Sequence, residues 1–139
     1  MAFAGGCLCG QVRFEIDAEA PLSVRHCWCR DCQYIGAGSG VVSAGFRKTA
    51  VTISGLMNDF VSRADSGSVM HRRFCARCGT QLFSEAEPRP HLIFVRVGAL
   101  DEPNAVTPTM TIWTKSAPTW ACFDPRLPAL EGQPAPPPA

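Results

Sequence analysis

The sequence predicts a mainly β domain with little helix, and three observations support this prediction. Apolar and polar residues alternate in many short runs separated by turn-forming residues, which is the pattern of short, half-buried strands. No segment keeps a helical period over about ten residues. Seven of the eight cysteines lie in closely spaced groups, and metal ions held by such groups can fasten the sheets of a small domain.

The strand pattern occurs at residues 11–17, 22–27, 41–44, 51–54, 59–62, 69–74, 80–84, 92–97 and 110–114. The first run is the clearest, because Val12, Phe14 and Ile16 point to one side and charged residues point to the other. Turn formers fill residues 65–68, so we expect a hairpin between the strands that flank them. The nearly continuous apolar run over residues 92–97 predicts a central, well-buried strand.

One helical turn is expected at residues 31–35, and the glycine-rich run over residues 36–40 ends it. The chain is short enough to form a single zinc-binding β domain, which we place at residues 1–131. Residues 132–139 are rich in proline, which cannot donate a backbone hydrogen bond to a sheet or helix. We therefore expect a mobile tail there.

Composition excludes several classes of partner. The formal net charge is +1, from 13 basic and 12 acidic residues, whereas bulk binding to nucleic acid or anionic lipid needs a basic surplus. No apolar run reaches the roughly 18 residues of a membrane span, and the first residues do not form a secretory signal. We expect a cytoplasmic protein with reduced thiols, no nucleic-acid or membrane partner, and an oligomeric state that the sequence leaves open.

The first chemical motif holds Cys27, Cys29 and Cys32 within six residues. Thiolates this close together converge most naturally on one soft metal ion such as zinc. Three protein ligands leave a fourth position for water or a substrate, and a thiol bound at that position is ionised at neutral pH. We expect the small residues of the 36–40 run to leave room above this metal.

The second motif holds four cysteines in two pairs, Cys7 with Cys9 and Cys75 with Cys78. Four thiols form a closed structural site, and a shared metal would fasten the first predicted strand to the middle of the chain. A glycine follows each pair and permits the positive φ with which a backbone aims its N–H groups at sulfur. Buried or redox-active thiol pairs are the alternative.

The three-cysteine motif could also be a second structural site with a fourth protein ligand. The candidates for that ligand are Cys122, His26, His71 and His91. Arg25 and Arg30 flank the motif and could offset its negative charge. We interpret the basic cluster of Arg72, Arg73 and Arg77 in the same way, as counter-charges for nearby thiolates.

Several motifs occur in the order seen in one family. They are Gly6-Cys7-Leu8-Cys9-Gly10, Cys27-Trp28-Cys29-Arg30-Asp31-Cys32, Phe74-Cys75-Ala76-Arg77-Cys78-Gly79-Thr80-Gln81-Leu82, Gly98-Ala99-Leu100-Asp101, and Ile112-Trp113 through Trp120. In these residues the chain resembles the glutathione-dependent formaldehyde-activating enzyme family, which also includes the centromere protein V relatives. Many relatives have histidine between the first two cysteines of the three-cysteine motif, where this chain has Trp28.

The resemblance implies an Mss4-like fold of several small coiled antiparallel sheets stapled by zinc. It also implies two zinc ions per chain. The structural ion would bind Cys7, Cys9, Cys75 and Cys78, and the catalytic ion would bind Cys27, Cys29 and Cys32.

The named reaction of the family joins glutathione and formaldehyde as S-hydroxymethylglutathione, which is a carbon–sulfur lyase reaction run in reverse. The resemblance therefore implies an enzyme whose partners are a small thiol, glutathione or a similar co-substrate, and an aldehyde. Two other hypotheses remain: a non-catalytic zinc-stabilised β module that binds a protein or chromatin partner, and a thiol redox protein that uses Cys29 and Cys32.

Overall fold

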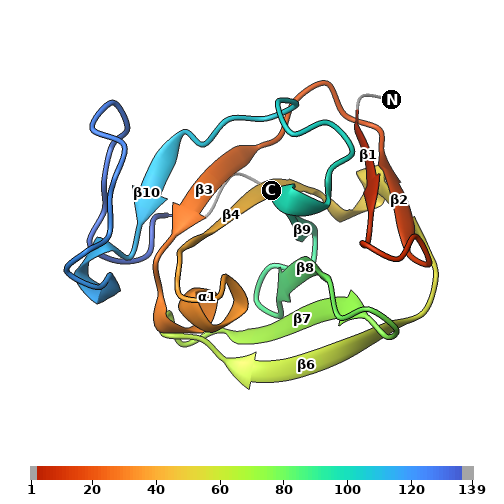
Figure 1. Ribbon diagram of the computed structural model, residues 1–139, viewed down its shortest axis with the longest axis horizontal. Coiled ribbons are helices and arrows are strands. Elements are labelled where there is room, and N and C mark those ends of the chain that lie inside the picture. The colour runs from red at the N-terminus through yellow and green to blue at the C-terminus, as the bar shows by residue number, and fades with distance from the viewer. Residues whose placement is uncertain (1–2, 136–139) are drawn as a thin grey trace.

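The computed structural model describes residues 3–135, so the part of the predicted tail at residues 136–139 lies outside it. The described strands form two sheets, one of three strands and one of seven (Figure 1). The described residues contain only one short α-helix and three 3-10 turns. The mainly β, Mss4-like fold that the sequence predicts is confirmed. None of the helices in residues 3–135 is long and apolar enough to cross a membrane.

The strands are β1 (Phe3–Gly6), β2 (Arg13–Ile16), β3 (Ser23–Cys27), β4 (Val41–Arg47), β5 (Val51–Ser54), β6 (Met57–Arg63), β7 (Val69–Cys75), β8 (Gln81–Ala86), β9 (Leu92–Arg96) and β10 (Met110–Ile112). The helical elements are α1 (Arg30–Ile35) and the 3-10 turns η1 (Lys48–Ala50), η2 (Val97–Ala99) and η3 (Thr114–Ser116).

The smaller sheet has the antiparallel order β1-β2-β5. Phe14 and Ile16 of β2 are buried and their charged neighbours are exposed, as the alternation predicts. Strand β1 has no such alternation in its sequence and was not predicted. The backbone of Gly5 lies so close to that of Ala99 that a Cβ would be 2.2 Å from the Ala99 carbonyl oxygen. This strand therefore depends on close backbone packing that only glycine permits.

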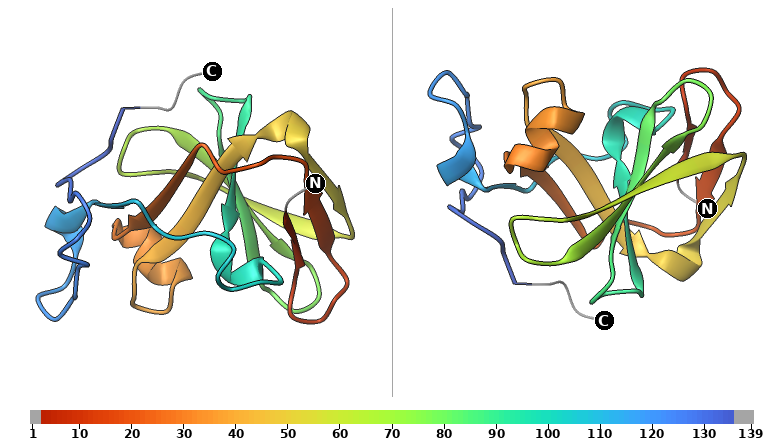
Figure 2. Two further views of the ribbon diagram at one scale, coloured as in Figure 1. Left: turned by 90° about the horizontal axis from the view of Figure 1, so that it is seen from above. Right: turned by 90° about the horizontal axis from the view of Figure 1, so that it is seen from below.

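The larger sheet has the order β10-β3-β4-β9-β8-β7-β6 and is antiparallel except where β10 joins β3 in parallel. It coils strongly, so that β6 and β7 run across the direction of β3 and β4 (Figure 2). Strand β9 lies between β4 and β8, which is the central position predicted for it. Strands β6 and β7 pair from Arg63 and Val69 outward, so the predicted hairpin is confirmed.

The two faces of the larger sheet have different characters. One face packs into the main core against β2, with Phe83 edge-on to Phe14 at 5.2 Å between ring centroids. On the other face, the register places Arg25 of β3 beside Ser43 of β4, and Ser43 beside Arg96 of β9. Because side chains alternate between faces, Cys27 lies on the same face as Arg25. This polar face is the wall of a cavity.

The chain after β10 folds back onto that strand. The amide of Leu130 donates to the carbonyl of Thr111 at 2.9 Å. The indole N–H of Trp113 donates to the side chain of Gln133 at 2.8 Å, and the Trp113 amide contacts the carbonyl of Gly132 at 3.4 Å. The first residues of the predicted tail are thus bonded to the domain.

Candidate metal centres and the cavity beside one of them

The structure brings together the four cysteines of the first candidate site. The thiols of Cys7, Cys9, Cys75 and Cys78 all lie within 4.8 Å of one another. Sulfur separations of 3.5 Å for Cys7–Cys9 and 3.8 Å for Cys9–Cys75 are too long for disulfides and suit a shared metal ion. Cys7 and Cys9 come from the loop after β1, whereas Cys75 ends β7, so the site joins the two sheets.

Backbone amides point at these sulfur atoms, as they do around thiolates that bind a metal. The amide of Val12 donates to Cys7 Sγ at 3.2 Å, and the amide of Cys78 donates to Cys75 Sγ at 3.4 Å. The glycines after the two pairs, Gly10 and Gly79, have φ values of +82° and +77°. The positive φ expected of them is confirmed, and a side chain at either position would strain the loop.

Thr80 ties the two loops of this site together. Its hydroxyl oxygen accepts a hydrogen bond from the amide of Leu8 at 3.0 Å and lies 3.1 Å from Cys78 Sγ. The contact with Thr80 lowers the pKa of Cys78 to about 5. An exposed thiol with that pKa is a thiolate at neutral pH, which is the form that binds a metal.

The structure also brings together the three cysteines of the second candidate site. The thiols of Cys27, Cys29 and Cys32 lie within 4.8 Å of one another. Cys27 ends β3, and Cys29 caps the first turn of α1, where its sulfur accepts a hydrogen bond from the amide of Cys32 at 3.4 Å. The helix predicted from the sequence therefore begins inside the motif. Its start places the thiols of Cys29 and Cys32 close to that of Cys27.

The hydrogen bonds among these three thiols favour one thiolate over three. Hydrogen bonds from Cys27 and Cys32 lower the pKa of Cys29 to about 3. The hydrogen bond with Cys29 raises the pKa of Cys27 far above its ordinary value. The protein groups alone thus favour one thiolate that is bonded by two thiols. A soft divalent cation would let all three ionise, and a set of three sulfur donors fits zinc.

No fourth side chain of the ligating types joins this group within residues 3–135. His26 packs on the ring of Trp28 at 5.2 Å between centroids, and His71 bonds to Asp59 at 2.6 Å and to Glu87 at 2.8 Å. Cys122 and His91, the other two candidates, are exposed and lie outside the group. The described residues therefore give this site three protein ligands.

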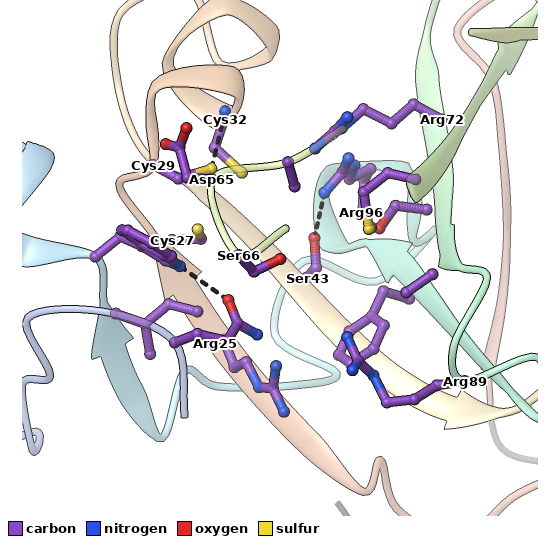
Figure 3. Close-up of a pocket in the computed structure, with 18 residues that line it drawn as sticks. Arg25, Cys27, Cys29, Cys32, Ser43, Asp65, Ser66, Arg72, Arg89 and Arg96 are labelled. Atoms are coloured by element: carbon purple, nitrogen blue, oxygen red, sulfur yellow. Dashed lines mark hydrogen bonds between the residues drawn. The ribbon is translucent and has the colours of Figure 1, made fainter. Parts of the chain in front are cut away.

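A cavity of about 100 Å³ opens beside the three cysteines (Figure 3). The cysteines lie along one side of it, and the β6–β7 turn contributes Asp65 and Ser66. Ile112 and Trp113 of the C-terminal part also line it. The remaining walls carry four arginines: Arg25, Arg72, Arg89 and Arg96.

Two of these arginines act on the thiolates. Arg72 is buried and pairs with Asp31 at 3.3 Å, and its charge helps to lower the pKa of Cys29. Arg96 is buried and donates to Ser43 at 2.9 Å. Burial lowers the pKa of Arg96, and the nearby cysteines oppose that shift. Both residues therefore offset the negative charge that three thiolates would gather.

The expectation that the glycine-rich run leaves room above the three thiols was wrong. The glycine-rich run at residues 36–40 does not line the cavity, and Gly40 instead packs against the backbone of Cys27, where a Cβ would lie 2.8 Å from the carbonyl oxygen. Arg30 does not face the cavity either, and it bonds to Gln33 and lies over the ring of Tyr34. The room beside the thiols comes instead from the coiled face of the larger sheet.

Trp28 also lies away from the cavity. Its buried ring packs edge-on against Trp120 at 6.3 Å and Phe123 at 5.9 Å between centroids. Trp28 thus belongs to an aromatic cluster behind the three-cysteine motif and does not line the cavity beside the thiols.

Sequence reasoning did not single out Arg89 or Arg96 as site residues. A signal for Arg96 was present, because it is the one charged residue in the nearly continuous apolar run at 92–97. A charge at an inward position of a buried strand calls for a polar partner or a ligand. Arg89 sits in a proline-flanked loop, and nothing in the sequence connects that loop with the cysteines.

Comparison with known proteins agrees with this geometry. Residues 2–116 match the family described as glutathione-dependent formaldehyde-activating enzyme. The crystal structure of a Rhodobacter sphaeroides protein is similar in fold, with a TM-score of 0.57 and 20% sequence identity. That similarity covers 91% of this chain and 98% of the other. Taken with the two cysteine clusters, the match shows that this chain belongs to the glutathione-dependent formaldehyde-activating enzyme family.

Proposed function

We propose that this chain is a zinc-dependent carbon–sulfur lyase that adds a small thiol, such as glutathione, to an aldehyde or releases it again in the cytoplasm. In this proposal Cys27, Cys29 and Cys32 hold the catalytic zinc. The four-cysteine cluster, Cys7, Cys9, Cys75 and Cys78, holds a structural zinc. The observation that carries the proposal is the position of the three thiols on the wall of a cavity that opens beside them.

A zinc ion at this site would supply Lewis acidity that ionises a bound thiol at neutral pH. The chain itself contributes charge balance, because Arg72 and Arg96 face the thiolates. Ile112 and Trp113 are buried beside the thiols and restrict the access of water to that side of the cavity. In such surroundings, electrostatic interactions between charged groups are stronger than in water.

The reaction needs few protein groups. The thiol of the substrate gives up its proton, and its sulfur forms a bond to the carbonyl carbon of the aldehyde. The electron pair of the carbonyl π bond moves to the oxygen, which takes up a proton to give a hydroxyl group. The reverse sequence breaks the carbon–sulfur bond and returns the thiol and the aldehyde.

Replacing one ligand of the three-cysteine site tests this function. We expect Cys29→Ala to remain folded, to hold one zinc ion where the wild type holds two, and to lose detectable binding of glutathione. Metal analysis, circular dichroism and calorimetric titration measure the three properties. Cys122→Ala is the matched control, because Cys122 is exposed and belongs to neither cluster, and it should behave as the wild type does.

Two results would contradict the proposal. Equal binding of glutathione by the wild type and by Cys29→Ala would remove the three-cysteine site from the reaction. An absence of thiol binding by zinc-loaded wild type would favour a non-catalytic β module.

A further inference from the structure

Arg25 and Arg89 form a pair of like charges with no anion between them. No hydrogen bond or ion pair joins either guanidinium group to another residue within 3–135, and the Nε of Arg25 is buried without a partner. Both side chains line the same cavity, and Arg25 is buried there. Two cations near each other on one cavity wall therefore repel, and a bound anion would relieve that repulsion.

The other two arginines of the cavity have partners for their terminal amino groups, although the Nε of each is also buried without one. Arg72 has the carboxylate of Asp31 and the hydroxyl of Ser62 as partners, and Arg96 has the hydroxyl of Ser43. Both also face the thiolates of the three-cysteine site. The cavity thus divides into a sulfur side with its own counter-charges and a second side with two guanidinium groups that have no hydrogen-bond or ion-pair partner within residues 3–135 (Figure 3).

Both unpaired side chains are presented by ordered backbone. Arg25 lies in β3 between β4 and β10, and its guanidinium group lies over the ring of Phe94 at 5.1 Å from the centroid. Arg89 lies in a tight turn in which its amide donates to Ala86 at 2.9 Å and its carbonyl accepts from Leu92 at 3.1 Å. The backbone at both positions, and the stacked side chain of Arg25, therefore need little further ordering when a ligand binds.

The separation of Arg25 and Cys27 along β3 sets how far the arginine pair lies from the sulfur of a bound thiol. Arg25 precedes Cys27 by two residues on the same face of β3, a separation of about 7 Å along a strand. A separation of this size suits a small molecule whose sulfur faces the three cysteines and whose anionic group lies a few bonds away, toward Arg25 and Arg89. Guanidinium groups bond carboxylates in a planar, bidentate manner.

We propose that Arg25 and Arg89 form a carboxylate-binding subsite, so that the site takes a thiol that carries a carboxylate a few bonds from its sulfur. This inference rests on the proposed function for the position of the sulfur, and on the unpaired arginines for the carboxylate. The preference for an anionic thiol over a neutral one then comes from the protein and not from the metal.

Calorimetric titration of the zinc-loaded protein with two matched thiols tests the subsite. We expect 3-mercaptopropionate to bind about tenfold more tightly than 2-mercaptoethanol, as a charge-assisted hydrogen-bonded pair implies. Arg89→Gln should bring the two affinities close to each other. Arg126→Gln, which removes the same charge from an exposed residue outside the cavity, should keep the preference.

The outcomes separate this inference from the proposed function. If the wild type binds both thiols equally, or Arg89→Gln keeps the preference, the assignment of the subsite to the thiol is wrong even though thiol binding stands. If neither thiol binds, the proposed function fails. Binding of propionate that depends on Arg89 would then support the subsite alone, and its absence would overturn both. If glyoxylate is preferred over formaldehyde through Arg89 while the two thiols bind alike, the carboxylate belongs to the aldehyde and the assignment to the thiol is wrong.

Discussion

The four-cysteine and three-cysteine clusters use the same side chain in opposite settings. The four-cysteine cluster lies where the two sheets meet, draws its thiols from segments 66 positions apart, and has Cys7 and Cys75 in the main core. The three-cysteine cluster comes from one short segment, lies in a separate small core with Ile112 and Trp113, and borders a cavity. A cysteine cluster whose metal closes a long loop contributes to stability. A cluster that leaves one metal position open can bind a ligand.

Removing a ligand of the four-cysteine cluster should have the largest effect. Cys75 is 1% exposed and lies at the join of the two sheets. We expect Cys75→Ser to lower the free energy of unfolding by about 4 kcal/mol, the chain-entropy contribution of a cross-link over a loop of this length. Thermal and urea unfolding measure the change, with Cys122→Ser as the control. A melting temperature equal to that of the wild type would mean that Cys75 holds no structural metal.

Limited chelation should separate the two clusters without any mutation. A metal with three protein ligands and an open side exchanges more readily than one enclosed by four thiolates. We expect a mild chelator to remove one zinc ion of two while the far-ultraviolet circular dichroism stays unchanged. Metal analysis after gel filtration measures the loss. Simultaneous release of both ions with unfolding would contradict the assignment of different roles to the two clusters.

The smallest expected effect concerns pH and the strand that carries Cys75. Hydrogen bonds to Asp59, and then to Glu87, raise the pKa of His71 on β7. A raised folded pKa means that the protonated ring stabilises the fold fully below its unfolded pKa of about 6.5. This stabilisation is lost as the pH rises through the folded value. Urea unfolding of wild type and His71→Gln should therefore differ more at about pH 6 than at about pH 9. A difference independent of pH would show that the ring contributes only by packing.

Much of the fold could be predicted because its strands alternate in the usual way. The run containing Phe14 and Ile16 and the hairpin at residues 65–68 follow from local patterns alone. Strand β1 could not be predicted in the same manner, because Gly5 and Gly6 serve close packing that only the tertiary structure reveals. The parallel pairing of β10 with β3 joins segments far apart in the chain and leaves no local signal.

The candidate site, like the fold, could be predicted only where its signal lies in a short stretch of sequence. Both cysteine sets are local motifs, and the structure brings each set together as a group. The cavity depends on how strongly the larger sheet coils and on which strands become neighbours. Arg25, Ser43 and Arg96 are contiguous only through the register of β3, β4 and β9, so no spacing rule could have connected them.

The parallel pairing of β10 with β3 has a consequence for assembly during synthesis. Cys27 ends a strand whose outer edge stays unpaired until Met110–Ile112 have been made, and Trp113 comes later still. At ordinary rates of translation the delay is several seconds. The three thiols are thus made early and covered late, and during that interval their edge is open to metal ions, to oxidants and to other unpaired strands.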